Sequence, residues 1–316
     1  MTTLSLLTPS GRLTLGNLLG ALLPMAERQD DAYYGLSDLH AMTTPHDPAL
    51  LRERAREMAT LLLAVGLDRS TLFRQSAVPA HSALAQLLES TAHTGELNRM
   101  IQFKEKGRGV ASTRVSLYTY PVLMAADFLL YRPEEVPVGD DQRQHVELTR
   151  DLAVRFNHAY GPVFTVPEVV SPPAGARVMD LADPTRKMSK TAEGAGSVLL
   201  LDPPDVVRRK VARAVTDSDT GPEAVRPDRD AKPGVTNLLD ILHACGGSSE
   251  GITTYGALKT AVTDAVVAVL EPVRARYREL ADAPEHVRSV YAEGAQRCRE
   301  VTAPVLAAAR EAMGLD

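Results

Sequence analysis

Cysteine and tryptophan are scarce in this chain of 316 residues, which has two cysteines and no tryptophan. Cys245 and Cys298 show neither the spacing of a metal site nor the pattern of a disulfide framework. Such cysteine usage fits a reducing compartment, so we expect a cytoplasmic protein. The absence of tryptophan has no mechanistic meaning by itself.

Long apolar runs are also missing from the sequence. No stretch approaches the roughly 20 apolar residues of a membrane span, so no membrane partner is expected. The first residues lack the basic-then-apolar pattern of a secretory signal. The formal net charge of −5 excludes a global basic field, so a nucleic-acid partner would have to bind to local basic patches.

The sequence contains 44% hydrophobic residues, which is enough for a large core. Its length suggests two domains. Short apolar runs before turn residues predict strands at residues 4–7, 32–36, 72–76, 135–138, 163–170 and 197–201. Helical spacing predicts helices at residues 13–22, 48–65, 91–106, 118–131, 142–156, 203–215, 237–245, 255–270, 272–280 and 284–313. This order predicts an α/β domain followed by an α-helical domain.

The first predicted strand ends at Thr8-Pro9-Ser10-Gly11, and a helical pattern follows. Open α/β sheets use this arrangement of strand, small-residue turn and helix to present a helix N-terminus to a phosphate. Gly16 lets a nucleotide lie close to the backbone, and Thr14 and Asn17 share one helical face. The alternative is an ordinary first βα unit with capping polar residues.

A second candidate segment is Lys187-Met188-Ser189-Lys190-Thr191, in which two lysines flank a hydroxyl residue. A turn sequence with Pro184 precedes it, and small residues that include Gly194 and Gly196 follow. Ammonium groups on flexible stems suit a polyphosphate whose charge moves during a reaction. The alternative is a solvated basic loop.

Asp127 is a carboxylate inside an otherwise apolar helical pattern, on the same face as Met124 and Phe128. Burying an ionised carboxylate is costly unless it is paired or hydrogen-bonded. We therefore expect either a helix-face Asp that meets a backbone or arginine donor, or a pocket carboxylate that accepts a ligand N–H. A pocket of the second kind rejects a ligand without that donor, because its acceptor is left unpaired.

Polar residues also follow two other predicted strands, at the position where open α/β sheets bind ligands. His40 comes after the strand at residues 32–36, and Gly139-Asp140-Asp141 follow the strand at residues 135–138. The two adjacent acids do not predict a metal site, because neighbouring side chains diverge and no further ligand is suitably spaced. We expect His81 and His145 to be structural.

Taken together, these segments resemble a known family. Pro-Ser-Gly-x-x-Thr-Leu-Gly-Asn at residues 9–17 and Lys-Met-Ser-Lys-Thr at residues 187–191 are similar to the paired motifs of class I aminoacyl-tRNA synthetases. Residues 136–153 closely resemble the tryptophanyl and tyrosyl branch, and Thr14 and Asn17 resemble its bacterial tryptophanyl members. The resemblance covers nearly the whole chain, with the motifs in the family's order.

This resemblance implies a Rossmann-like nucleotide-binding domain with a parallel sheet, joined to an α-helical anticodon-binding domain. It implies that ATP activates L-tryptophan to tryptophanyl-adenylate with release of pyrophosphate, and that tryptophan then passes to tRNA(Trp). Mg²⁺ would bind through the ATP phosphates, with no metal site made by the protein alone. Because family members are homodimers, we expect a homodimer.

The implied domains divide the chain at the lysine-containing segment. Residues 1–186 would form the catalytic domain, to which the C-terminal helix at 297–316 could rejoin. Residues 187–296 would form the lysine-containing segment and the anticodon-binding domain. Basic residues between 99 and 114 would lie near the tRNA acceptor stem, and the arginines of the helical domain would be compatible with anticodon binding.

The resemblance also assigns roles to individual residues. The activation group is Thr14, Asn17, Lys106, Lys187 and Lys190. The ATP-binding group comprises Thr8, Pro9, Ser10, Gly16, Asn17, Gly139, Asp140, Asp141, Val178, Lys187, Met188, Ser189, Lys190 and Thr191. The tryptophan-binding group is His40, Met124, Asp127, Val136, Val138 and Gln142, in which Asp127 accepts the indole N–H.

Some residues depart from the family's pattern. Thr8 stands where this branch usually has Gln, Leu4 and Leu6 replace aromatic and glycine residues, and Thr191 replaces the usual Ser. Thr191 is a mild change, because it keeps the hydroxyl. The first strand would pack near ATP and the indole, so we expect its departures to bear on affinity, inhibitor response or substrate tolerance. Two alternatives stay open: tyrosyl specificity on the same fold, against which Asp127 argues, and a paralogue that forms the adenylate or binds tRNA outside translation.

Overall fold

A parallel sheet lies at the centre of the fold. The computed structural model describes residues 2–107, 109–133, 135–137, 142–170, 177–189, 194 and 196–315, without the side chains of Lys106, Glu135, Pro137 and Val169. The sheet contains β1 (Thr3–Leu7), β2 (Ala32–Leu36) and β3 (Thr71–Arg74), in that order. A second parallel pair consists of β4 (Glu135–Pro137) and β5 (Glu168–Val170). This arrangement confirms the predicted α/β class.

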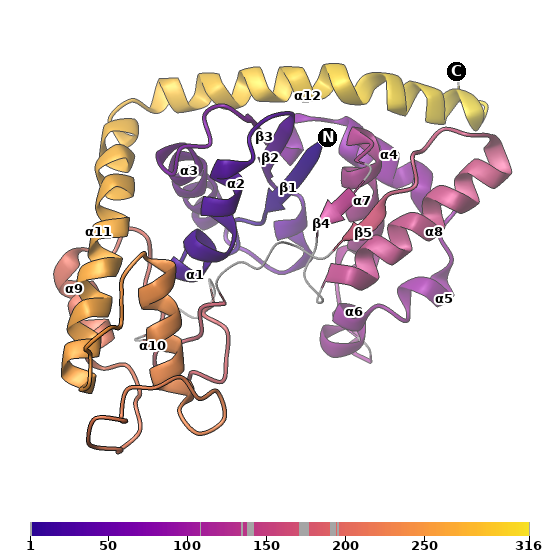
Figure 1. Cartoon of the computed structure of the whole chain (residues 1–316). Coiled ribbons are helices and arrows are strands. Elements are labelled where there is room, and N and C mark those ends of the chain that lie inside the picture. Colours follow the sequence, from indigo (N-terminus) through magenta and orange to yellow (C-terminus); the bar gives the residue numbers. More distant parts are fainter. Residues whose placement is uncertain are drawn as a thin grey trace.

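Helices connect and flank these strands (Figure 1). The segment after β1 contains α1 (Leu15–Asn17), the π-helical turn η1 (Leu18–Leu22) and α2 (Leu23–Glu27). The segment after β2 contains the 3-10 turn η2 (His40–Thr43) and α3 (Pro48–Ala64). The segment after β3 contains the 3-10 turn η3 (Gln75–Ala77), α4 (Ala80–Glu89), α5 (Thr94–Leu97), α6 (Ile101–Lys106) and α7 (Val115–Tyr131). The helix α8 (Arg143–Tyr160) lies between β4 and β5 in the chain.

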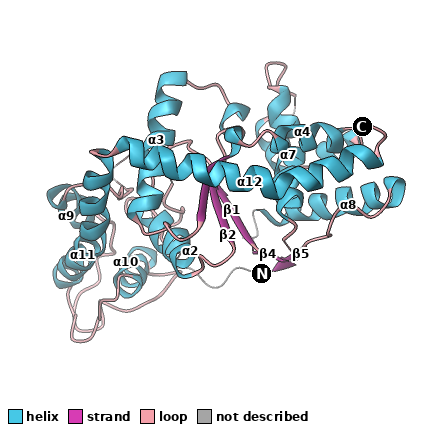
Figure 2. Cartoon of the chain, turned by 90° about the horizontal axis from the view of Figure 1, so that it is seen from above, coloured by secondary structure: helices cyan, strands magenta, loops and turns pink. Residues whose placement is uncertain are grey.

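The last third of the chain is helical. Its helices are α9 (Pro204–Ala212), α10 (Pro233–Ala244), α11 (Tyr255–Ala281) and α12 (Pro284–Ala312). Figures 1 and 2 show α9, α10 and α11 grouped on one side, with α12 running from this group across the sheet toward α4 and α8. Among the described residues, none of the helices combines the length and apolar character that a bilayer crossing requires.

The helix α12 packs directly on the edge strand β3. A Cβ atom added to Gly294 would lie 1.8 Å from the carbonyl oxygen of Leu72, so only glycine allows this approach. Near the start of the helix, the Tyr291 hydroxyl donates to the carbonyl oxygen of Ala59 at 3.1 Å. The C-terminal helix therefore belongs to the same packed unit as the sheet.

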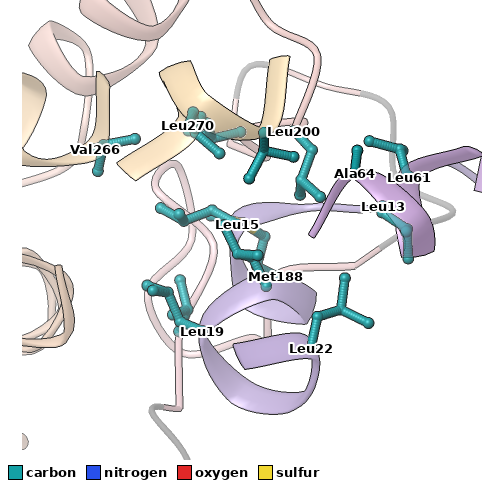
Figure 3. Close-up of a cluster of buried hydrophobic side chains, with 14 of the residues drawn as sticks. Leu13, Leu15, Leu19, Leu22, Leu61, Ala64, Met188, Leu200, Val266 and Leu270 are labelled. Carbon is teal, nitrogen blue, oxygen red and sulfur yellow. The ribbon is translucent and has the colours of Figure 1, made fainter. Parts of the chain in front are cut away.

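Two groups of buried apolar side chains fill the fold. In the first, Leu15 and Met188 lie with Leu200, Leu61 of α3 and Leu270 of α11 (Figure 3). The second group lies among α4, α7, α8 and α12. Its members include Phe73, Leu129, Phe156 and Cys298. The first group anchors the beginning of the lysine-containing segment, and the second surrounds the helix that carries Asp127.

Several predicted elements differ from those observed. The helix expected at 13–22 is replaced by short pieces, with the π-helical turn η1 just before Pro24, whose ring excludes a regular α-helical turn there. The helix expected at 91–106 is two short helices, α5 and α6. Residues 197–201 form an isolated bridge from Leu199 to Thr14 instead of a strand. The helix α11 continues through Pro272 because Leu270 and Val273 on either side are buried.

Candidate active site

A cavity of about 710 Å³ lies between β1, the segment after β2, and α7. Its polar lining includes Thr8, Ser10, His40, Gln102, Tyr120, Asp127, Gln142 and His145. Its apolar lining includes Leu4, Leu6, Met124, Phe128 and Val136. The cavity thus combines an apolar wall with a few convergent polar groups, which is the usual composition of a small-molecule site.

The Asp127 carboxylate has several hydrogen-bond donors around it, and its side chain is only 2% exposed. Oδ2 lies 2.8 Å from His40 Nε2, and Oδ1 lies 2.6 Å from His81 Nδ1. The amide Nε2 of Gln75 donates to Oδ1 at 2.7 Å and to Oδ2 at 2.9 Å. These bonds satisfy the carboxylate that the sequence predicted to need a donor, although neither an arginine nor a backbone group supplies it.

The pKa of Asp127 reflects this environment. Burial alone raises the pKa of the carboxyl group, but hydrogen bonds and attraction from His40 and His81 outweigh burial and lower it to about 2. The group is therefore ionised at neutral pH and acts only as an acceptor. His40 Nε2 and His81 Nδ1 must accordingly carry the protons of these two hydrogen bonds.

Sequence reasoning missed Gln75 and His81 as parts of this site. Gln75 begins the turn after β3, and His81 lies in the first turn of α4. Both side chains are fully buried, at 0% exposure. A buried carboxylate in the sequence signals that donors must exist, but it does not indicate which distant residues supply them.

The apolar wall of the cavity comes from three elements. Met124 and Phe128 are one helical turn apart on α7, and Val136 of β4 is 2% exposed. Leu4 and Leu6 contribute from β1, at the positions that depart from the family's pattern. The structure therefore brings the predicted residues His40, Met124, Asp127, Val136 and Gln142 to a single cavity.

His145 also faces this cavity, although the sequence suggested only a structural role. Its Nε2 lies 2.6 Å from the Tyr120 hydroxyl, and both residues line the cavity. Burial raises the pKa of Tyr120 to about 12, so the phenol stays neutral at physiological pH. The pair adds a polar group to the cavity on the side of α8.

A second hollow of about 550 Å³ adjoins the cavity and shares Ser10, Ala41 and Thr44 with it. Pro9 and Gly11 from the first turn line this hollow, together with Arg54. The Thr8 hydroxyl is 2.9 Å from the Ser37 hydroxyl, which joins the ends of β1 and β2. The first turn therefore lies where the two hollows meet.

Thr14 and Asn17 are bonded to each other. The backbone N–H and the hydroxyl of Thr14 donate to Asn17 Oδ1 at 3.0 and 3.1 Å. Thr14 is fully buried, whereas Asn17 is partly exposed. Oδ1 of Asn17 is thus held by the buried Thr14. The other end of the amide, Nδ2, carries the hydrogen-bond donors of this side chain.

Gly16 lies against the segment predicted to flank a nucleotide. A Cβ atom at Gly16 would be 3.5 Å from the Cβ atoms of Val178 and Met188. Both of those side chains are buried in the first apolar group, at 2% and 5% exposure, and Figure 3 shows Met188 there. Lys187 is exposed and pairs with Met179 through a β-bridge, and Ser189 is half-buried.

Several predicted site residues lie outside the described part of the structure. They are Val138, Gly139, Asp140, Asp141, Lys190 and Thr191, together with the side chain of Lys106. Within the described residues, no group of three or more His, Cys, Asp or Glu side chains is arranged to hold a metal ion.

The arginines of the helical domain are largely engaged in local contacts. Arg274 is 6% exposed and bonds to Glu271 at 2.7 Å and to the Asp202 carbonyl oxygen. Arg276 pairs with Glu279 at 2.8 Å. The buried Arg274 therefore stabilises the domain and cannot present its charge to a nucleic acid.

Comparison with known proteins places this chain in a family. The family model "tRNA synthetases class I (W and Y)" matches residues 1–275. The chain is 51% identical to tryptophan–tRNA ligase 1 of Streptomyces avermitilis, over 97% of this chain and 96% of that protein. The tryptophanyl-tRNA synthetase of Mycoplasma pneumoniae has a TM-score of 0.89 and 35% identity, over 100% of this chain and 98% of that chain.

The fold has a further parallel among solved structures. The tryptophanyl-tRNA synthetase of Campylobacter jejuni, solved in complex with ADP and tryptophan, has a TM-score of 0.86 and 30% identity over the full length of both chains. These neighbours confirm the Rossmann-like fold that the sequence predicted. By its family model and its near full-length relatives, the chain belongs to the class I tRNA synthetases of the tryptophan and tyrosine branch.

Proposed function

We propose that this chain activates L-tryptophan with ATP and transfers it to tRNA(Trp). The family makes the chain an aminoacyl-tRNA ligase, and its curated relatives are tryptophan–tRNA ligases. One observation carries the choice of amino acid: an ionised carboxylate, Asp127, borders a cavity of about 710 Å³ that has an apolar wall. That combination suits an aromatic side chain with a single N–H donor.

Tryptophan enters the cavity with its indole against Met124, Phe128 and Val136. The ring N–H donates to the cavity side of Asp127, which cannot itself donate because it is ionised. A ligand without that N–H forgoes a hydrogen bond to a charged group, which is worth about 1.5–3 kcal/mol. The thioether of Met124 packs well on an aromatic face.

The amino-acid end of the substrate then lies toward Gln142 and the first turn, while His40 stays beside the ring N–H through its bond to Asp127 Oδ2. Val138 contributes to the same pocket in this proposal. From there the substrate carboxylate reaches the α-phosphate of ATP, which lies over the first turn and Gly16. This direction is supported by the second hollow, which shares Ser10 with the cavity and is lined by Pro9 and Gly11.

ATP binds along the first turn and the start of the lysine-containing segment. Gly16 permits close approach of the adenosine, and the Nδ2 group of Asn17 donates to the nucleotide. Thr14 is buried, so it acts by holding the Asn17 amide through Oδ1. The remaining proposed contacts are Thr8, Pro9, Ser10, Val178, Met188, Ser189 and Thr191, with Gly139, Asp140 and Asp141 at the ribose.

In the activation step the tryptophan carboxylate oxygen bonds to the α-phosphorus as the bond from that phosphorus to the bridging oxygen breaks. Pyrophosphate leaves with the electron pair, and Lys187, Lys190 and Lys106 stabilise its charge. When bound through the phosphates, Mg²⁺ supplies further charge neutralisation, and the described residues offer no carboxylate cluster of their own for it. The protein mainly positions the two reactants.

The domain division and the assembly complete the proposal. Residues 1–186 form the catalytic domain, rejoined by residues 297–316, and residues 187–296 form the lysine-containing segment and the anticodon-binding domain. The hydrogen bond from Arg299 to the Ala77 carbonyl oxygen at 2.7 Å supports the return of residues 297–316 to the sheet. The contact of Gly294 with β3 indicates that α12 meets the sheet before residue 297 as well. The enzyme is a cytoplasmic homodimer that charges tRNA(Trp), as in its family.

Amino-acid-dependent exchange between ATP and pyrophosphate tests the proposal directly. Exchange should occur with tryptophan and be much weaker with tyrosine, and the activated tryptophan should then charge tRNA(Trp). Exchange with tyrosine only would favour tyrosyl specificity on the same fold. Exchange with tryptophan but no charging of any tRNA would favour a paralogue outside translation.

A further inference from the structure

Behind Asp127, a second layer of buried polar side chains leads away from the cavity. His81 bonds through Nδ1 to Asp127 Oδ1 at 2.6 Å, and its Nε2 lies 3.1 Å from the Tyr131 hydroxyl. Tyr131 is one helical turn after Asp127 on α7 and is 3% exposed. The thiol of Cys298, on α12, is a further polar neighbour of the Tyr131 hydroxyl.

The direction of these hydrogen bonds follows from the charge of Asp127. An ionised carboxylate only accepts, so His81 Nδ1 carries a proton. In the neutral imidazole Nε2 is then an acceptor, and the Tyr131 hydroxyl is the donor that faces it. A single arrangement, from Tyr131 through His81 to Asp127, satisfies all of these groups at once.

Packing holds the same groups in place. The His81 ring stacks on Phe73 with ring centroids 5.8 Å apart and an interplanar angle of 18°. The Tyr131 ring lies 5.6 Å from the His81 ring and 5.7 Å from the Phe73 ring. Burial raises the pKa of Tyr131, so its hydroxyl keeps its proton at neutral pH. The imidazole therefore has little freedom to turn away from Asp127.

The two oxygens of Asp127 face different surroundings. His40, which bonds to Oδ2, lines the cavity and has a side chain that is 12% exposed. His81, which bonds to Oδ1, is at 0% exposure. Oδ2 is therefore the oxygen nearer the cavity, and Oδ1 is the one held from the interior.

We propose that His81 and Tyr131 are positioning residues that fix the orientation of Asp127, so that Oδ2 is presented to the ring N–H of the substrate. This inference rests on the proposed function and deepens it, because it extends substrate selection to residues that do not touch the substrate. Loss of the Tyr131 hydroxyl frees His81 Nε2, so His81 no longer holds Oδ1 in one fixed direction, and the Gln75 amide is the buried donor that remains there.

The test compares tryptophan with 3-benzothienylalanine, a substrate of nearly the same shape whose ring sulfur replaces the N–H. The ratio of their kcat/KM values in ATP–pyrophosphate exchange isolates the hydrogen bond to Asp127. Tyr131→Phe should lower this ratio at least about fivefold, mainly by raising KM for tryptophan. His81→Asn, which keeps a donor near the position of Nδ1 but lacks Nε2, should lower the ratio to a similar extent.

Tyr291→Phe is the matched control, because it also removes a buried tyrosine hydroxyl from a hydrogen bond, here with the Ala59 carbonyl oxygen, and does not contact Asp127. Its ratio should equal that of the wild type, even if its melting temperature falls as far as that of Tyr131→Phe. Equal losses of kcat/KM for both substrates in Tyr131→Phe and His81→Asn would overturn the positioning role. Absence of tryptophan-dependent exchange in the wild type would overturn the proposed function, and this inference with it.

Discussion

Replacing Gly294 with alanine should destabilise the fold, because α12 rests there on the backbone of β3. The new Cβ atom would lie 1.8 Å from the Leu72 carbonyl oxygen and 3.2 Å from the Leu72 amide nitrogen. An ordinary non-bonded contact is roughly 3.5 Å, and backbone atoms cannot rotate away, so α12 must move off the strand. Overpacking typically destabilises a protein by about 1–3 kcal/mol. Because the backbone of α12 must shift here, we expect a cost near the upper end of that range.

Alanine is a better helix former than glycine by about 1 kcal/mol, which partly offsets the clash. We expect a net loss of about 2 kcal/mol in the free energy of unfolding, measured by urea denaturation at neutral pH. Gly256→Ala is the control, since Gly256 lies in α11 with nothing within 4 Å of an added Cβ atom. That variant should be as stable as the wild type or slightly more so. A Gly294→Ala variant within about 0.5 kcal/mol of the wild type would refute the packing of α12 on the sheet.

The nucleotide side of the site and the Asp127 carboxylate give three further predictions. Gly16→Ala should raise KM for ATP at least about tenfold in exchange assays, because adenosine is proposed to lie against Gly16. The melting temperature should not fall, since the added Cβ atom meets Val178 and Met188 at ordinary distances. An unchanged KM for ATP would contradict the proposal that adenosine lies against Gly16. Lys187→Met should lower kcat for exchange at least about tenfold, with a KM for tryptophan close to the wild type; an unchanged kcat would contradict its role. Between about pH 4 and pH 2 the wild type should lose about 2 kcal/mol of unfolding free energy that Asp127→Asn does not lose, because the folded pKa of Asp127 lies below its unfolded value of 3.8. Urea denaturation of both proteins across this pH range measures the difference. Parallel pH profiles of the two proteins would count against an ionised Asp127 carboxylate.

The sequence identified the parts of the site that local patterns encode. Asp127 was predicted because a carboxylate in an apolar helix must be satisfied, and Met124 and Phe128 followed from helical spacing. Its donors were not predicted, since Gln75 and His81 are 52 and 46 positions away and meet it only through tertiary packing. Local sequence patterns therefore cannot identify hydrogen-bond partners that come from distant parts of the chain.

The fold shows a similar division between local and tertiary signals. The strands β1, β2 and β3 follow from apolar runs and turn residues, and the helix α3 follows from helical spacing. The continuation of α11 through Pro272 did not follow, because burial on both sides of the proline overrides the local preference. The burial of Arg274 was missed for a related reason: Glu271 is a local partner on the same helix, but the Asp202 carbonyl oxygen, 72 positions away, meets Arg274 only through tertiary packing.

The exchange activity of Asp127→Asn is the most direct test of the proposed amino-acid specificity. The variant keeps the size of the side chain but removes the charge that the ring N–H meets. With tryptophan as substrate, kcat/KM should fall at least about 100-fold while the protein remains folded. Asp38→Asn is a suitable control, because Asp38 accepts from the Ser76 N–H at 2.9 Å and does not line the cavity, so it should retain wild-type exchange. Near-normal exchange with tryptophan in a folded Asp127→Asn variant would contradict the claim that Asp127 selects the substrate.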